Sequence, residues 1–168
     1  NPNQFIKTIG GFYKLKANEI FVKLEFNSNF SNDSLKTISI SDRSKWKKIS
    51  EKPKLLQGKW LMAGRVIGNN ERRRDITKSR KTMKILIDGY FQWIAFNTSN
   101  FRFSGTGGGS YSVENGKYIE TIDYFSRDNK KVGVSLSFNY QKNGNDWYHR
   151  GFSSKGDPLH EIWAFRNP

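Results

Sequence analysis

The clearest structural signal in the chain is the stretch Val132-Gly133-Val134-Ser135-Leu136-Ser137-Phe138-Asn139-Tyr140, in which apolar residues alternate with small or polar ones. In a β-strand this alternation places the apolar side chains on one face and the other side chains on the opposite face. The same period of two recurs in residues 20–26, 118–124 and 159–165. We predict that these segments are strands, each with one face turned toward a core.

Turn signals separate the predicted strands. They include Asp88-Gly89, Asn115-Gly116, Asn143-Gly144-Asn145-Asp146 and Lys155-Gly156-Asp157-Pro158. Asn-Gly and Asp-Gly accept the positive φ values of tight hairpins, so neighbouring strands should pair antiparallel. The only helical candidate is residues 69–84, whose charge suits a loop or one short helix. We therefore expect an all-β protein with an antiparallel, up-and-down sheet that forms a barrel or a sandwich.

Composition narrows the class of protein. The chain has 168 residues, of which 35% are hydrophobic and 15% aromatic. It has no run near the roughly 18 apolar residues of a transmembrane helix, and its aromatic content argues against disorder. The absence of cysteine excludes disulfides, thiolate chemistry and cysteine-based zinc sites. The net charge is +14, and because Asn1 is not a methionine we expect a processed or trimmed chain.

A weak internal repeat relates two parts of the sequence. Residues 10–15 and 19–28 align without gaps with residues 108–113 and 117–126, and Trp46 then echoes Trp147 after a small gap. Any two hairpins of an all-β protein could align this well. Alternatively, residues 1–53 are half of a degenerate repeat, joined at Lys52-Pro53-Lys54 to a complete domain at residues 54–168. The N-terminal strands would then extend the sheet or form a homodimer, because unpaired sheet edges promote association.

Few motifs could carry out chemistry. The segment Gly105-Thr106-Gly107-Gly108-Gly109 lacks the spacing and the following helix of a phosphate-binding loop, so we interpret it as a bulge or tight corner in a strand. His149 and His160 show no metal-ligand spacing with carboxylates, and nothing resembles a nucleophile elbow. We therefore expect no enzymatic activity, no metal and no cofactor.

A basic segment is a second kind of candidate site. Residues 71–84 contain seven basic and two acidic residues, and the candidate anion-binding residues are Arg72, Arg73, Arg74, Lys78, Arg80 and Lys81. Such a cluster could bind the phosphates of a nucleic acid or another anionic polymer. Because basic residues are spread through the rest of the chain, no single charged face is indicated, and nucleic-acid binding is not favoured.

The segment Leu56-Gln57-Gly58-Lys59-Trp60-Leu61 contains a Gly-x-Trp motif that resembles the first strand of lipocalins and related calycin barrels. Further segments strengthen the likeness, and together they resemble lipocalin-like secreted proteins of unknown function from Bacteroidetes. These segments are Asp88–Trp93, Gly105–Tyr111, Glu120–Ser126 and Ser153–Trp163.

The resemblance covers residues 56–166 and implies a small antiparallel barrel. It also implies export to the periplasm, the cell envelope or beyond, with no established enzymatic activity or ligand. In that family Trp60, together with Gly58, would close the barrel floor, and Arg166 would pack across the indole. Such a cation–π contact contributes roughly 0.5 to 2 kcal/mol.

A barrel of about eight strands encloses either a packed core or one small ligand. By strand parity, the candidates for lining a pocket are Trp93, Tyr118, Glu120 and Trp147, with Glu120 as a polar anchor. The favoured hypothesis is an exported, non-enzymatic barrel that binds a small apolar or amphipathic molecule or a glycan fragment. The alternative is a pocketless interaction module that binds an anionic polymer or a protein partner through the basic loop and the N-terminal strands.

Overall fold

The structure is a computed structural model that describes residues 4–17, 19–42, 44, 46 and 54–167. Its first sheet contains three antiparallel strands in the order β1(Ile9–Lys16), β2(Glu19–Asn27) and β3(Thr37–Ile40), with the short helix α1(Phe30–Asp33) between β2 and β3. The predicted joint at Lys52-Pro53-Lys54 falls mostly outside the described residues, since only Lys54 is described.

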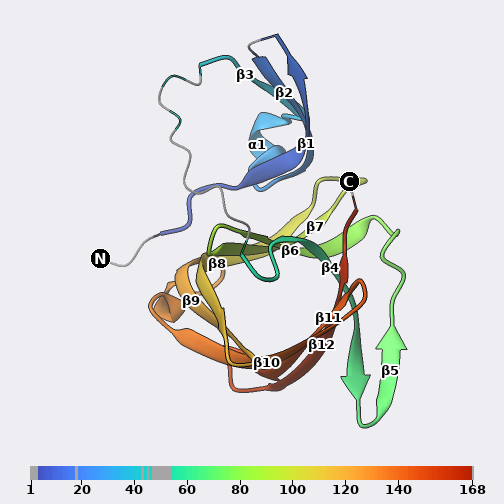
Figure 1. The fold of residues 1–168 in the computed structure, drawn as a ribbon. Helices are drawn as coiled ribbons and strands as arrows, with labels where there is room; N and C mark the ends of the chain where they lie inside the picture. The colour runs from blue at the N-terminus through green and yellow to red at the C-terminus, as the bar shows by residue number, and fades with distance from the viewer. Residues whose placement is uncertain (1–3, 18, 43, 45, 47–53, 168) are drawn as a thin grey trace.

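The second sheet closes on itself. It contains β4(Gly58–Ile67), β5(Asn70–Arg73), β6(Arg80–Ile87), β7(Tyr90–Asn97), β8(Phe103–Glu114), β9(Lys117–Phe125), β10(Ser135–Asn143), β11(Asp146–Phe152) and β12(Pro158–Phe165). Sequential strands pair antiparallel from β6 to β12, β4 pairs with β6, and β12 pairs with β4 to complete the ring. β5 pairs with β4 alone among the described strands, outside the ring (Figure 1). The predicted all-β, antiparallel up-and-down barrel is confirmed, with eight strands in the ring.

Two local predictions were wrong in part. Residues 69–84, predicted as a loop or one short helix, form β5, a loop at residues 74–79 and the start of β6. β6 is a strand because it has hydrogen-bonding partners on both sides, in β4 and β7. The strand predicted at residues 132–140 begins only at Ser135. It is preceded by the 3-10 turn η1(Asn129–Lys131), and Gly133 then takes a φ of +87°, which interrupts the extended backbone.

The glycine-rich segment lies inside β8 and forms a bulge, as predicted. The pairing with β9 shifts between Gly108 and Gly109. A Cβ atom added at Gly109 would lie 1.9 Å from the carbonyl oxygen of Thr121 on the neighbouring strand. Glycine therefore permits a close backbone approach at this point, and the bulge bends the strand around the ring.

One end of the barrel is closed by Trp60, whose side chain is buried at 1% exposure. Its indole Nε1 donates a hydrogen bond to the carbonyl oxygen of Leu56 at 2.8 Å. Phe165 packs edge-on against the indole, with ring centroids 5.1 Å apart. Gly58, at a φ of +142°, leaves room for this ring, because an added Cβ would lie 2.4 Å from Phe165.

Arg166 does not lie across Trp60 as the resemblance implied. Its guanidinium lies 4.9 Å from the centroid of the Phe12 ring and donates two hydrogen bonds, each 2.8 Å long, to the carboxylate of Glu25. The physical reason is the alternation along β12, where Leu159, Trp163 and Phe165 share the face that packs into the barrel core. Phe165 therefore contacts Trp60, and the next residue, Arg166, turns outward toward Glu25.

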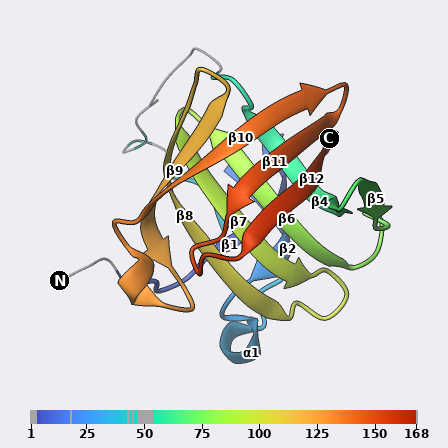
Figure 2. The ribbon, with the colours of Figure 1, turned by 90° about the horizontal axis from the view of Figure 1, so that it is seen from below.

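The N-terminal sheet packs on the outer surface of the barrel. Phe26 joins a buried cluster with Leu61, Met83, Ile94 and Phe96, whose side chains point away from the barrel interior. The Glu25–Arg166 pair lies beside this cluster, and in Figure 1 the three-stranded sheet lies on one side of the ring. Figure 2 shows the barrel strands after a rotation of 90°, seen from below.

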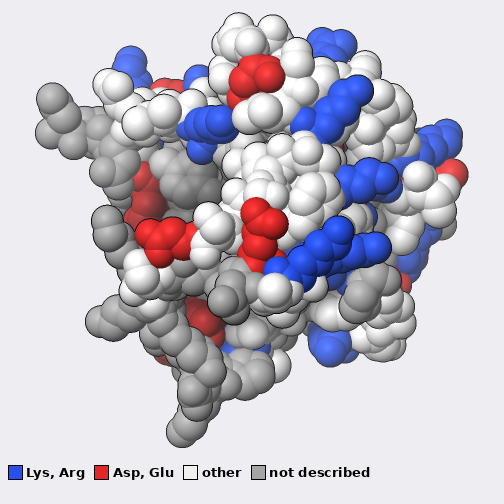
Figure 3. All heavy atoms as spheres, turned by 90° about the horizontal axis from the view of Figure 1, so that it is seen from above, with Lys and Arg blue, Asp and Glu red and all other residues white. Residues whose placement is uncertain are grey.

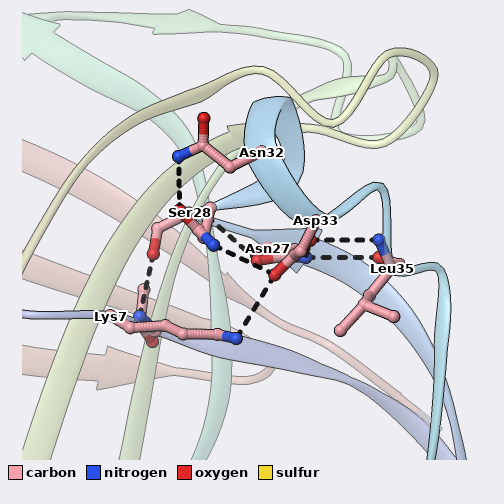
Figure 4. A network of polar contacts seen from close by, with 8 residues as sticks. Lys7, Asn27, Ser28, Asn32, Asp33 and Leu35 are labelled. Carbon is pink, nitrogen blue, oxygen red and sulfur yellow. Dashed lines mark hydrogen bonds and ion pairs between the residues drawn. The ribbon is translucent and has the colours of Figure 1, made fainter.

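A polar network fixes the turn after β2 (Figure 4). The buried Asn27 side chain donates to Asp33 Oδ1 at 2.6 Å and accepts from the backbone N–H of Asn29 at 2.9 Å. Asp33 also accepts from the backbone N–H of Leu35 at 3.0 Å. This last bond is the main reason why the pKa of Asp33 lies below its ordinary value. The network holds α1 against the end of β2.

Candidate ligand pocket

A cavity of about 310 Å³ lies inside the barrel, at the end opposite Trp60. At its mouth are Arg127, which follows β9, and Ser153 and Ser154, which follow β11. Deeper in the barrel the walls are mostly apolar and aromatic, and they include Met62, Phe91, Trp93, Ile122, Leu136, Phe138 and Trp163. A concave, mostly apolar space with a few convergent polar groups is typical of small-molecule sites.

The central polar feature of the cavity is a buried ion pair between Lys84 of β6 and Glu120 of β9, which are 4% and 5% exposed. Aromatic rings surround the ammonium group. Its Nζ atom lies between 5.2 and 5.7 Å from the ring centroids of Phe91, Tyr118, Trp147 and Trp163. Cations are attracted to the faces of aromatic rings. The ammonium group of Lys84 is therefore held by Glu120 on one side and by aromatic rings around it.

A second polar pair lies beside the first. His149 of β11 and Glu161 of β12 have Nδ1 and Oε2 3.5 Å apart, and the imidazole ring packs 3.9 Å from the centroid of Phe138. Burial lowers the pKa of His149 below its ordinary value, and the nearby positive charge of Lys84 lowers it further. We therefore treat His149 as a neutral imidazole at pH 7.

Several buried polar atoms near the cavity have no hydrogen-bond partner among the described residues. They are the hydroxyl of Tyr118, Nε1 of Trp147 and both ring nitrogens of His149. Buried polar groups in proteins are normally hydrogen-bonded, and each one left unpaired costs about 1 to 3 kcal/mol. Of these three side chains only His149 lines the cavity, and its Nδ1 already faces Glu161 at 3.5 Å. Nε2 of His149 is therefore the atom of this set that a water molecule or a polar group of a ligand could pair with.

The structure brings the predicted pocket residues together around Lys84. Trp93 and Glu120 line the cavity. Tyr118 and Trp147 are fully buried at 0% exposure and pack against each other, with ring centroids 5.0 Å apart. They therefore form the packed layer next to the cavity rather than its surface.

Sequence reasoning missed Lys84 and the His149–Glu161 pair as pocket residues. Lys84 had been counted as part of the basic segment. Its position between Thr82 and Leu86 in one strand was the available signal, because residues two apart share a face of a strand. At the mouth, Arg127 was also missed, and its guanidinium lies 5.6 Å from the ring centroid of Trp93.

The candidate anion-binding residues are not gathered into one site. Arg73 is held by hydrogen bonds to Glu71 and Asp146, both at 2.8 Å. Arg74 donates to the carbonyl oxygen of Met62, and Lys81 donates to backbone carbonyl oxygens of its own loop. Exposed side chains remain at Arg72, Lys78 and Arg80. On the face seen in Figure 3, Lys and Arg stand in several separate groups.

The fold and the cavity define the class of this protein as a closed eight-stranded antiparallel barrel with a polar pair inside it. In comparisons with known proteins, neither a family model nor a curated protein matches the chain. The described residues contain no group of three or more His, Cys, Asp or Glu side chains arranged to hold a metal ion. Within the same residues, no helix is long and apolar enough to cross a membrane.

Proposed function

We propose that this protein is an exported, non-enzymatic barrel that binds a small amphipathic molecule in the cavity above Lys84 and Glu120. The observation that carries the proposal is a cavity with mostly apolar walls whose lining also includes the buried polar side chains of Lys84, Glu120 and His149. Export is proposed from the resemblance of residues 56–166 to lipocalin-like secreted proteins.

The arrangement favours a molecule with one polar end. The apolar walls would bury the body of the ligand, at roughly 25 cal/mol for each Å² of apolar surface removed from water. The polar end would reach the region of Lys84, Glu120 and His149. The cavity volume of about 310 Å³ suits a compact ligand, because small-molecule pockets range from about 300 to 1,000 Å³.

The proposal can be tested with a fluorescent amphipathic probe, anilinonaphthalene sulfonate, and with native mass spectrometry of the protein as purified. Leu136 lines the cavity, whereas the adjacent Ser137 is exposed on the other face of β10. We expect Leu136→Trp to fill the cavity and to weaken probe binding at least about tenfold, a loss of about 1.4 kcal/mol. Ser137→Trp is the matched control and should bind like the wild type.

Both variants keep the N-terminal sheet unchanged, so probe bound there contributes equally to the two titrations. A retained mass of a few hundred daltons that is lost on denaturation, and is absent from Leu136→Trp, would support the proposal further. Equal probe affinity in the two variants would refute binding in the barrel cavity.

A further inference from the structure

The N-terminal sheet repeats the geometry of β8, β9 and β10 at a constant offset of 98 residues, the separation between Gly10 and Gly108. The pairing of β1 with β2 shifts between Gly10 and Gly11, where the partners change from Phe26 to Leu24. The pairing of β8 with β9 shifts at the equivalent place, from Tyr124 to Ile122. The two hairpins therefore carry the same bulge at the same repeat position.

The contacts around the bulge repeat as well. Thr8 and Ser28 exchange a backbone-to-hydroxyl bond of 2.9 Å and a backbone bond of 2.9 Å. Thr106 and Ser126, each 98 residues later, exchange the same two bonds at 2.8 and 2.9 Å. A short helical turn follows in both segments, α1 in the first and η1 in the second. Such detailed agreement exceeds what two unrelated hairpins of an all-β protein share.

The repeat identifies one face of the N-terminal sheet as the interior face of a barrel. Tyr111 lies in the barrel interior at 6% exposure, whereas Tyr13, its counterpart at the offset of 98, is 65% exposed. Trp46, which aligns with Trp147 after a small gap, is 58% exposed, whereas Trp147 is 0% exposed. The N-terminal face forms an open apolar groove of about 620 Å³, lined by residues that include Tyr13, Leu15, Ile20, Val22, Ile38 and Trp46. Apolar residues in these positions are suited to burial.

In the complete barrel, the face equivalent to this groove is covered by strands β4, β6 and β7. Tyr111 and Tyr118 pack in one cluster with Trp60 of β4, Leu86 of β6 and Phe91 of β7. The outer edge of β8 pairs with β7 from Phe103 to Ser110. In the part of the chain that the structure describes, β1 pairs with β2 alone, so its outer edge is free.

We propose that the N-terminal sheet is half of a second barrel. The partner that covers its apolar groove is a sheet of the kind formed by β4, β6 and β7. This sheet pairs with the free edge of β1 and approaches it from the N-terminal side of Thr8. The reason is that, in the complete barrel, the turn between β7 and β8 lies on the N-terminal side of Thr106, the residue equivalent to Thr8. This inference is independent of ligand binding in the complete barrel.

The repeat also specifies one residue of the occupant. Glu120, which pairs with Lys84 in the complete barrel, corresponds to Val22 in the N-terminal sheet. A lysine opposite Val22 would be a buried charge without a partner, which is strongly unfavourable. The matching sheet therefore carries an apolar residue at the position equivalent to Lys84.

The test adds a copy of residues 55–98 directly before residue 1 of the full chain, which reproduces the repeat spacing. The copy is made in two forms, one unchanged and one with Lys84→Leu. Hydrogen exchange read by mass spectrometry then reports on the amides of β1, with β8 as an internal standard for folding of the complete barrel. We expect the Lys84→Leu form to slow exchange in β1 at least about tenfold relative to the unextended chain, and to protect it more than the unchanged form.

Two variants of the extended chain sharpen the result. Leu15 lines the groove, so Leu15→Lys should abolish the added protection, whereas Lys14→Gln on the other face of β1 should retain it. Unchanged exchange in β1 in both extended forms, with β8 still protected, would overturn the proposal. A concentration-dependent dimer of the unextended chain that Leu15→Lys dissociates would also overturn it, in favour of a second copy as the occupant.

Discussion

Replacing Lys84 with methionine is the most informative single change, because it separates the charge of this residue from its bulk. Methionine has a similar length, but it leaves Glu120 buried at 5% exposure without its ion-pair partner. Removing one member of a buried ion pair costs about 3 to 5 kcal/mol. Because domains of this size are stable by only about 5 to 15 kcal/mol, the loss is a large part of the total.

The measurement is urea unfolding followed by tryptophan fluorescence, supported by thermal unfolding. We expect the urea midpoint of Lys84→Met to fall with an unchanged slope, and the melting temperature to fall by about 6 to 20 °C, at roughly 2 to 4 °C per kcal/mol. Lys117→Met is a suitable control, because Lys117 is exposed on β9. It should change the unfolding free energy by less than about 0.5 kcal/mol.

The decisive comparison is the double variant Lys84→Met with Glu120→Leu. Replacing a buried ion pair by apolar residues is often neutral or stabilising, so the double variant should unfold within about 1 kcal/mol of the wild type. A double variant less stable than Lys84→Met alone would refute the reasoning. It would show that the two side chains stabilise the barrel separately, through packing, rather than as a pair.

Three further predictions concern the barrel floor, the contact between the sheets and the pH dependence. Trp60→Ala should lower the unfolding free energy by about 3 to 5 kcal/mol, as for other buried tryptophans, and normal urea unfolding of this variant would contradict its place in the floor. Arg166→Met should cost about 1.5 to 3 kcal/mol through its charged hydrogen bonds to Glu25, and combining it with Glu25→Gln should add little further loss in the same assay. Because the folded-state pKa of His149 is lowered, the unfolded chain binds more protons below about pH 6.5, and stability should fall as pH decreases, by up to about 1.4 kcal/mol per pH unit. His149→Gln should remove that part of the slope between pH 7.5 and pH 5.5, and an identical slope in the variant would show that other groups produce it.

The strands were predictable from the sequence because side-chain alternation survives in most of them. β9 and β12 follow the predicted segments, and the Asn-Gly and Asp-Gly turns lie between paired neighbours, such as Asn115-Gly116 between β8 and β9. The bulge at Gly108 was predictable for a related reason, since glycine clusters within a strand mark close backbone approaches.

Other features depend on contacts that no local pattern reveals. A lysine in a charged segment such as residues 71–84 is typical of solvent exposure, so the burial of Lys84 follows only from its pairing with a glutamate on a distant strand. Arg166 contacts Glu25, which lies 141 residues away in the sequence.

The way in which the barrel closes has a consequence for folding during synthesis. The ring closes through the pairing of β4, its first strand, with β12, its last strand. It therefore cannot close until residue 165 has left the ribosome. The hairpins of the N-terminal sheet need only neighbouring residues and can form much earlier. During that interval their apolar face and the free edges of both sheets are exposed together, and such species are prone to aggregate. Rapid completion of β12, or a chaperone that shields the early strands, should therefore determine how much of the protein reaches its native state.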